Sequence, residues 1–346
     1  MSSLYKVTKI EGKGLGCVAI SDIKKGSLIL KENPQLYVES EEIKWSSGWI
    51  KSLMTSFNEM IETDQHEYMK LHNKFNNFQN FHNTDFIRNC KEINDTIIED
   101  VKLEIGKIEQ NPESAEEILK IFGIYCTNSF EDGISIKVSR FNHSCQHNAD
   151  FTNVNGQLQL RAIGNIKAGK EININYLDEF AGFRNRKYRQ QNLFDGWDFF
   201  CVCDLCVSDV DIDAEAFEDF IQEAEKLTID RQSAFQAGIS LGTQYYSLED
   251  CNKEIVCYKQ LYKIGKDRNI QPYFLFRMLD KGFDAATTGY QLYKATDLKI
   301  DAMTFAKEAE MFGKILGNDI GTQGIPNFYE KVYQAVIDKA GYSQSK

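Results

Sequence analysis

Short segments that alternate apolar and polar residues begin the chain and return in its middle. Strands are expected in six such segments: Tyr5–Ile10, Cys17–Ile20, Ser27–Glu32, Ile134–Val138, Gln157–Ala162 and Glu171–Tyr176. Turns rich in glycine, notably Gly12–Gly16, separate the early segments, as is typical of antiparallel structure. The pattern therefore predicts a β-rich unit built from two separate parts of the chain.

Apolar residues at helical spacing fill the gap between these two parts and the end of the chain. Between about Glu41 and Phe130, helices are expected at Ile43–Met60, Glu67–Phe81, Ile93–Ile108 and from Pro112 onward. After Cys206, six more are expected: Ala214–Leu227, Ser233–Tyr246, Lys253–Asp267, Tyr273–Lys294, Ile300–Leu316 and Asn327–Ala340. The predicted class is α+β, with a helical insertion splitting the β unit and a C-terminal domain of helical hairpins.

The amino-acid composition argues against several classes of function for this chain. The chain has 346 residues, 42% of them apolar and 26% charged, which is enough for two domains with their own cores. A net charge of −11 argues against nucleic-acid binding and favours a basic protein segment as partner. No apolar run is long enough for a membrane span, and the first residues lack a secretory core. We therefore expect an intracellular protein, cytoplasmic or nuclear, with reduced thiols, and leave its oligomeric state open.

Three of the nine cysteines are clustered, at Cys201, Cys203 and Cys206. Thiolates at this spacing can bind one zinc ion from a single turn, but zinc takes four ligands and one is missing. The alternatives are three buried thiols without metal, or a redox pair, which usually opens a helix. The five scattered cysteines are expected to be buried as small apolar residues: Cys17, Cys90, Cys126, Cys251 and Cys257.

Three motifs follow one another along the chain: Arg140–Cys145 (RFNHSC), Glu171–Tyr176 (EININY) and Cys201–Cys206 (CVCDLC). In this order they resemble the SET-domain protein lysine methyltransferases, and the likeness extends from about Lys6 to Cys206. The resemblance implies a SET β fold with its pseudoknot and a zinc-bound post-SET segment. It also implies that Cys145 supplies the missing ligand, so that Cys145, Cys201, Cys203 and Cys206 bind structural zinc.

The resemblance suggests a division of the chain into five parts. These are a SET N-terminal half at 1–40, a helical insertion at 41–125, a SET C-terminal half at 126–180, a post-SET zinc segment at 181–208 and a helical domain at 209–346. The insertion is expected to shape the substrate groove, and the C-terminal helices to cover it.

A binding site for S-adenosylmethionine is also implied. Gly14 and Gly16 would let the backbone approach the cofactor, with Lys13 near its carboxylate. Asn142 and His143 would contact its amino-acid and adenine portions. Taken alone, a glycine turn of this kind is more often a simple hairpin turn. An Asn-His pair alone is usually part of a loop in which it bonds to its own backbone. The order and spacing of the whole set favour cofactor binding.

Three further residues complete the implied site. Asn128 would hold the methionine end of the cofactor, Phe199 would stack on adenine, and Tyr176 is the catalytic residue whose hydroxyl would orient the substrate amine. Glu171 is expected to be structural, pairing with a local donor. The implied function is a protein lysine N-methyltransferase, acting on a histone or another protein that presents lysine in a basic segment.

Two departures from the SMYD-like branch of this family stand out. Trp197 occupies the position of a second channel tyrosine, which puts the number of methyl groups transferred in doubt. The branch also carries a zinc finger of seven cysteines and one histidine, whereas here the insertion holds Cys90, His66, His72 and His82. These histidines are expected on the surfaces of amphipathic helices, and the finger is absent.

Two rival functions remain open. One is a catalytically silent SET module that serves as a scaffold for partner proteins, and the other is a methyltransferase for something other than lysine. The acidic segment 209–215 could attract a basic peptide, although such a run is more often a solvated linker.

Overall fold

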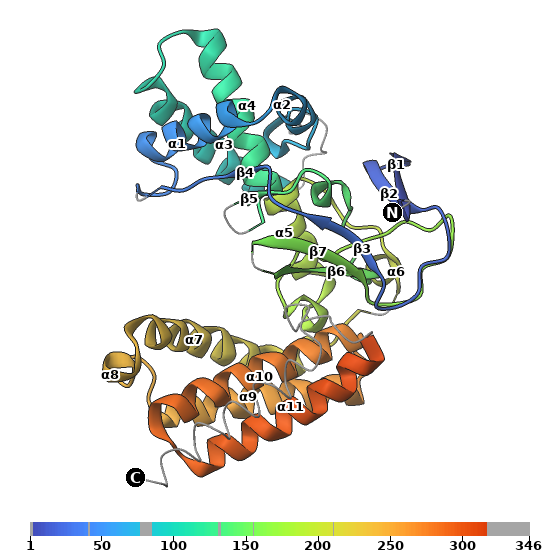
Figure 1. Cartoon of the computed structure of the whole chain (residues 1–346), viewed down its shortest axis with the longest axis vertical. Helices are drawn as coiled ribbons and strands as arrows, with labels where there is room; N and C mark the ends of the chain where they lie inside the picture. The colour runs from blue at the N-terminus through green and yellow to red at the C-terminus, as the bar shows by residue number, and fades with distance from the viewer. Residues whose placement is uncertain are drawn as a thin grey trace.

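The computed structural model describes residues 3–40, 42–76, 85–130, 133–154, 156–209 and 211–316. Figure 1 shows short strands at one side, a group of helices (α1–α4) at one end and a second group (α7–α11) at the other. The order of the chain parts is therefore the expected one, in which a β unit is interrupted by one helical group and followed by another. The proposed boundaries of the five parts stay a prediction.

In the residues that the structure describes, the β unit has three small antiparallel sheets. A hairpin pairs β1 (Tyr5–Ile10) with β2 (Gly14–Ala19), and a central sheet has the order β3 (Leu28–Glu32), β7 (Gln157–Ala162), β6 (Ala149–Val154). In the third sheet, β4 (Leu36–Tyr37) pairs with β5 (Gly133–Ile134). Because β3 pairs with β7 across the whole insertion, the two halves form one folding unit.

Several expected elements differ from the observed ones in this unit. The expected strand Ile134–Val138 is wrong beyond Ile134, since the chain turns there into the short helix η3 (Val138–Arg140). The segment Glu171–Tyr176 forms two isolated bridges, Val18 with Glu171 and His143 with Ile174. It thus passes between β2 and the loop after η3, bonding to both, and this crossing produces the expected pseudoknot.

The described part of the insertion contains four helices, whose apolar residues form one core with those of the β4–β5 sheet and the residues next to it. The four helices are α1 (Ser47–Glu59), α2 (Glu62–Tyr68), α3 (Asp85–Gly106) and α4 (Pro112–Asn128), with a short turn η1 (Lys74–Asn76). The expected helix Glu67–Phe81 is wrong, because α2 ends at Tyr68. The hydroxyl of Tyr68 donates to the Ile121 carbonyl at 2.7 Å, and the chain then turns at Leu71. Residues 77–81 lie outside the described part of the chain.

Up to Leu316, where the described residues end, seven helices follow the β unit. They are α5 (Arg186–Trp197), α6 (Asp204–Val207), α7 (Glu215–Ala237), α8 (Ile239–Gly242), α9 (Leu248–Asp267), α10 (Pro272–Tyr293) and α11 (Thr296–Leu316). The two helices expected across Ala214–Tyr246 are instead the long α7 and the short α8, divided at Gly238 with φ +73°. The expected helix Asn327–Ala340 lies outside the described residues.

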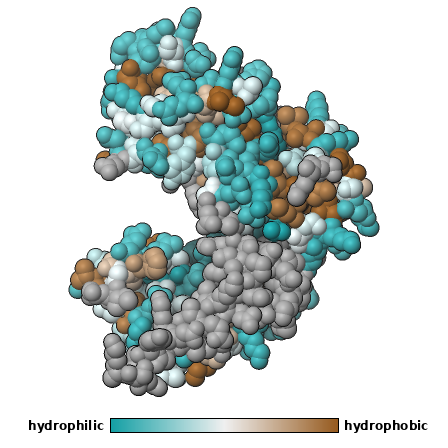
Figure 2. Space-filling model, in the orientation of Figure 1, coloured by the Kyte–Doolittle hydropathy of each residue, from teal (hydrophilic) through white to brown (hydrophobic). Residues whose placement is uncertain are grey.

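Helix α10 joins the C-terminal helices to the β unit. The Tyr273 hydroxyl donates to Asp150 at 2.8 Å, and Lys281 pairs with Glu179 at 2.8 Å. A side chain added at Gly182 would lie 2.2 Å from the Phe274 ring, so the helix approaches the backbone of the β unit closely. In Figure 2 the outline is open on the side between the insertion and the C-terminal helices. Within the described residues, no helix is long and apolar enough to cross a membrane.

Candidate functional site

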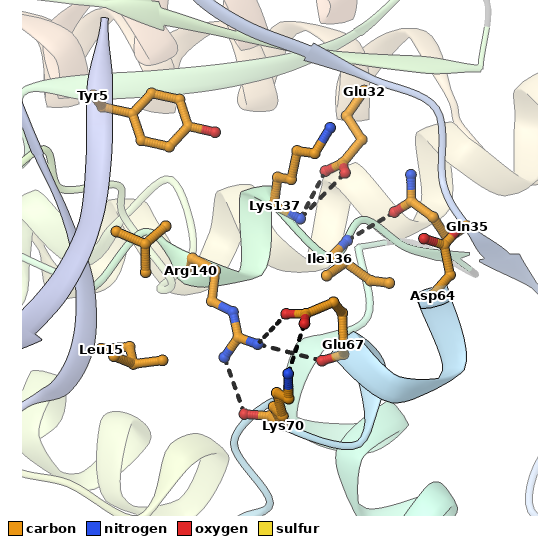
Figure 3. Close-up of a pocket in the computed structure, with 11 residues that line it drawn as sticks. Tyr5, Leu15, Glu32, Gln35, Asp64, Glu67, Lys70, Ile136, Lys137 and Arg140 are labelled. Atoms are coloured by element: carbon orange, nitrogen blue, oxygen red, sulfur yellow. Dashed lines mark hydrogen bonds and ion pairs between the residues drawn. The ribbon is translucent and has the colours of Figure 1, made fainter. Parts of the chain in front are cut away.

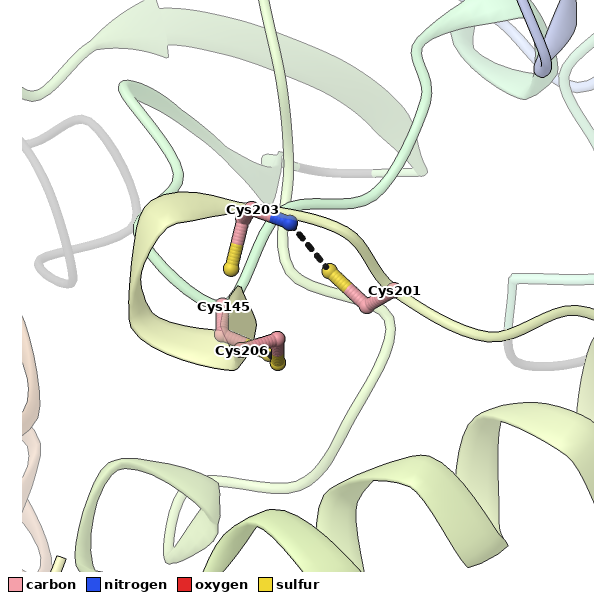
Figure 4. Close-up of side chains that lie close together, drawn as sticks. All are labelled: Cys145, Cys201, Cys203 and Cys206. Atoms are coloured by element: carbon pink, nitrogen blue, oxygen red, sulfur yellow. Dashed lines mark hydrogen bonds between the residues drawn. The ribbon is translucent and has the colours of Figure 1, made fainter. Parts of the chain in front are cut away.

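Four cysteine side chains converge below the central sheet. The sulfur atoms of Cys145, Cys201, Cys203 and Cys206 all lie within 4.8 Å of one another, with Cys203 half-buried and the others buried. Figure 4 shows that Cys145 comes from the loop after η3, and the other three come from the turn that enters α6. In this turn, the Cys206 N–H donates to the Cys203 carbonyl at 2.8 Å. The spacing C-x-C-x-x-C therefore places three thiols on one turn, facing the fourth.

These four thiols fit a zinc ion. A tetrahedral site with zinc–sulfur bonds of about 2.3 Å would hold its sulfur atoms about 3.8 Å apart, and those of Cys145 and Cys206 lie 3.5 Å apart. Four thiolates around a divalent ion carry a net negative charge. The fully buried Arg189 offsets part of it, with a guanidinium nitrogen 3.9 Å from the Cys206 sulfur and 3.6 Å from Asp211. Such a buried cation is costly beside neutral thiols and is stabilised beside a metal thiolate cluster.

The glycine turn and the Asn142 loop meet at one carboxylate. Glu171 accepts from the Asn142 amide at 2.8 Å and pairs with Lys13 at 2.8 Å. A side chain at Gly16 would lie 2.5 Å from the Asn142 amide nitrogen, so it would displace the Asn142 side chain. Glu171 is structural, as expected, and Lys13 is neutralised by it. A cofactor carboxylate would therefore have to compete with Glu171 for the Lys13 ammonium.

His143 lies at the centre of the site, almost fully buried. Its Nδ1 accepts from the Tyr176 backbone N–H at 3.0 Å, and its Nε2 lies 3.3 Å from the Cys145 sulfur. Its ring contacts the rings of Tyr176 and Phe199, with centroids 5.4 and 6.1 Å apart. The side chain is fully engaged by protein groups, so only its main chain is free to contact a cofactor.

Tyr176 is half-buried between aromatic rings. Its hydroxyl donates to the Phe141 carbonyl at 2.7 Å, and the centroid of its ring is 5.1 Å from that of Trp197. Burial raises the pKa of the hydroxyl above its usual range, and the nearby Cys17 and Glu171 add to the rise. The phenol therefore stays protonated near neutral pH and can act as a hydrogen-bonding dipole, not as a base.

Trp197 and Asn128 both contact His72, to which the sequence assigned no role in the site. His72, in the loop after α2, has its Nε2 at 3.1 Å from the Trp197 carbonyl, and its own carbonyl accepts from the Asn128 amide at 2.7 Å. The Trp197 indole N–H donates to the Thr127 carbonyl at 2.9 Å. His72 was expected on a helix surface. It is exposed, but it belongs to a loop that borders the candidate site.

The other two histidines of the insertion were also expected on helix surfaces. His66 is exposed on α2, as expected, and His82 lies outside the described residues, as does the side chain of Cys90.

A cavity of about 570 Å³ opens beside the glycine turn, between the β1–β2 hairpin, α2 and η3. Figure 3 shows Arg140 reaching across it to the segment after α2, where it donates to the Lys70 carbonyl at 3.0 Å. Leu15, which lies between Gly14 and Gly16, forms part of its wall. The cavity thus borders the Asn142 loop, because Arg140 is two residues before Asn142. The remaining lining residues are Tyr5, Val7, Glu32, Gln35, Asp64, Glu67, Ile136 and Lys137.

The site and fold together define a chain with a split β unit, an Asn-His loop threaded against a second segment, and a four-cysteine cluster. Residues 14–177 match the SET domain family model. The chain therefore contains a SET domain, which is the fold that the three motifs predicted.

Comparison with curated proteins gives distant relatives. A putative SET domain-containing protein, L678 of Acanthamoeba polyphaga mimivirus, is 27% identical over 225 residues, which cover 63% of this chain and 80% of the viral protein. Protein-lysine N-trimethyltransferase SMYD5 of Danio rerio is 40% identical over 81 residues, which cover 23% of this chain. The match spans only 20% of the length of SMYD5.

Among solved structures, Rubisco LSMT bound to sinefungin and monomethyllysine aligns with 98% of this chain and 88% of its own, at 13% identity and a TM-score of 0.42.

Proposed function

We propose that this protein is an S-adenosylmethionine-dependent protein lysine N-methyltransferase with a structural zinc ion. The observation that carries the proposal is the position of Tyr176. Its hydroxyl lies 2.7 Å from the Phe141 carbonyl, beside the Asn142–His143 loop and among the rings of Trp197 and Phe199. A phenol and a backbone carbonyl thus lie together among aromatic rings, a setting that suits an amine and a methyl group.

The proposed cofactor residues lie on two segments that meet at Glu171. Lys13, Gly14 and Gly16 belong to the glycine turn and Asn142 and His143 to the threaded loop, and Glu171 contacts both Lys13 and Asn142. The half-buried Phe199 and the Asn128 amide would contact the adenine and methionine ends. S-adenosylmethionine, when bound, supplies a methyl group on a positively charged sulfur.

The protein's role in the reaction is positioning and exclusion of water. Methyl transfer needs a neutral amine in line with the sulfur–methyl bond, and a lysine of pKa about 10.4 loses its proton more readily in an apolar channel beside a positive charge. The Tyr176 hydroxyl donates its proton to the Phe141 carbonyl, so its oxygen can accept a hydrogen bond from the amine and fix the direction of the amine lone pair. Backbone carbonyls such as that of Phe141 can hold the methyl group by weak C–H···O contacts.

The substrate is proposed to be a protein that presents lysine in a basic segment. A net charge of −11 and the open side between the two helical groups support this view. The acidic segment after the cysteine cluster is a weaker candidate for substrate binding. Asp211 accepts from the Arg186 backbone N–H at 2.7 Å, and Asp213 pairs with Arg268. This segment therefore serves internal contacts.

The test is transfer of a labelled methyl group to a mixture of basic proteins by zinc-loaded protein. Tyr176→Phe should abolish the transfer. Tyr293→Phe is the matched control, because Tyr293 also donates its hydroxyl to a backbone carbonyl, that of Tyr246 at 2.9 Å, far from the site in the C-terminal helices. Equal loss of transfer in both variants, or none in either, would refute the assignment of Tyr176.

A second candidate is a catalytically silent scaffold. Trp197 favours it, because an indole bound to the Thr127 carbonyl cannot offer a phenolic hydroxyl to the amine. Calorimetry with S-adenosylmethionine separates the two functions. Binding heat from zinc-loaded protein supports the enzyme, and its absence supports the scaffold.

A further inference from the structure

We propose that His143 is a positioning residue that links the metal cluster to the backbone of Tyr176, so that metal occupancy sets the geometry of the active site. The inference rests on the proposed function for its catalytic consequence, but not for its structural part. The two contacts of the imidazole carry it: Nδ1 with the Tyr176 N–H at 3.0 Å, and Nε2 with the Cys145 sulfur at 3.3 Å.

The first contact fixes the tautomer of the ring. A backbone N–H can only donate, so Nδ1 must be the acceptor and carries no proton. The proton of the neutral imidazole is then on Nε2, which points at the Cys145 sulfur. His143 therefore donates to a proposed zinc ligand with one nitrogen and accepts from the tyrosine backbone with the other.

Backbone hydrogen bonds also connect the His143 loop to the segment before Tyr176. The Ser144 N–H donates to the Ile174 carbonyl at 3.1 Å, and the Ile174 N–H donates to the Asn142 carbonyl at 3.0 Å. The loop and the segment before Tyr176 thus lie parallel, and the imidazole forms the next rung of this ladder. The imidazole also contacts the thiol of a proposed metal ligand, whereas the two backbone hydrogen bonds do not. Metal binding should therefore act on the imidazole.

A thiolate bound to zinc is a better acceptor of an N–H than a neutral thiol. Loading the metal should therefore strengthen the bond from Nε2 and hold the ring, and through Nδ1 the Tyr176 backbone, in place. Partners of this kind next to metal ligands typically change metal affinity or activity by about 10- to 100-fold when removed.

Two substitutions separate the two contacts. In His143→Asn, the short amide can still accept from the Tyr176 N–H but cannot reach Cys145, so zinc affinity should fall by about 10- to 100-fold. In His143→Gln, the longer amide can donate to Cys145 but leaves the Tyr176 N–H without its acceptor. Zinc affinity should then stay that of the wild type, and affinity for S-adenosylmethionine or turnover should fall by about two- to tenfold, as for one lost hydrogen bond.

The measurements are zinc affinity by competition with a chromophoric chelator, and the sulfur-to-metal charge-transfer band after cobalt(II) replaces zinc. The band should shift in His143→Asn and not in His143→Gln. Asn142→Ala is the neighbouring control, since it contacts Glu171 and no cysteine, and should leave both metal readouts unchanged.

Wild-type zinc affinity and an unshifted band in His143→Asn would overturn the inference, as would an equal loss of zinc in both His143 variants. The cobalt readout needs no methyl transfer. If the wild type bound no S-adenosylmethionine while the band still shifted in His143→Asn, the contact to the metal cluster would stand and only the proposed function would fail.

Discussion

Replacing Gly16 by alanine should damage the cofactor site while leaving the cysteine cluster intact. The added carbon would lie 2.5 Å from the Asn142 amide nitrogen, 2.7 Å from an Ile10 side-chain carbon and 3.1 Å from a Glu171 carboxylate oxygen. The first two separations are shorter than real contacts allow. Asn142 must therefore rotate away, and its 2.8 Å hydrogen bond to Glu171 breaks.

The size of the effect follows from these contacts. Overpacking of this kind typically costs about 1–3 kcal/mol of folding stability. Loss of the hydrogen bond from Asn142 to the Glu171 carboxylate costs about 1.5–3 kcal/mol of local stability. Displacement of Asn142 also removes one proposed contact with the cofactor. We expect the dissociation constant for S-adenosylmethionine to rise by about tenfold, which corresponds to about 1.4 kcal/mol.

The assay is calorimetric titration of zinc-loaded protein with S-adenosylmethionine, together with urea unfolding. Gly164→Ala is the matched control, because a carbon added there meets nothing within 4 Å. It should bind the cofactor like the wild type. The reasoning would be refuted if Gly16→Ala bound S-adenosylmethionine as tightly as Gly164→Ala.

Three other predictions concern the surroundings of the site. Burial raises the pKa of Asp198 to about 7, so the folded protein holds the proton of this carboxyl more tightly than the unfolded chain does. The free energy of unfolding should therefore fall as pH rises from about 4 to about 7. Asp198→Asn should flatten this part of the urea-unfolding profile, and an unchanged profile would contradict it. Gly182→Ala should lower unfolding stability by about 1–3 kcal/mol, since its added carbon meets the buried Phe274 ring at 2.2 Å. A neutral effect in urea unfolding would show that α10 moves aside freely. Arg189→Met should weaken zinc binding by about 10- to 100-fold in chelator competition, because it removes the buried cation beside Cys206. Unchanged affinity would mean that the cluster needs no compensating charge.

Three of the four cysteines of the cluster could be predicted from the sequence because they lie close together in the chain. Cys201, Cys203 and Cys206 share one turn, and a resemblance of motifs supplied Cys145. The helices of the C-terminal region were also predictable where one face is plainly apolar, as in α10. Both cases depend on short-range patterns, which a sequence displays directly.

Other features depend on contacts that no local pattern reveals. His72 meets the Trp197 carbonyl across 125 positions of sequence, so its spacing from other histidines in the insertion was uninformative. Helix α5 was not predicted from the sequence. The fully buried Arg189 occupies a core position there, so the buried face of the helix does not read as apolar. Helix α7 continues past Leu227 because Arg231 pairs with the buried Glu254 of α9 at 3.2 Å. In α5 and α7 a buried arginine occupies a position where a pattern would recognise an apolar residue.

The central claim is that a metal-bound cysteine cluster and Tyr176 together support methyl transfer to lysine. Its most direct test is mass spectrometry of lysine residues in a basic protein mixture after incubation with S-adenosylmethionine and the protein, before and after removal of zinc by a chelator. We predict methylated lysine from the zinc-loaded protein and none after zinc removal. Absence of methylated lysine from zinc-loaded protein, or methylation that survives complete removal of zinc, would contradict the account.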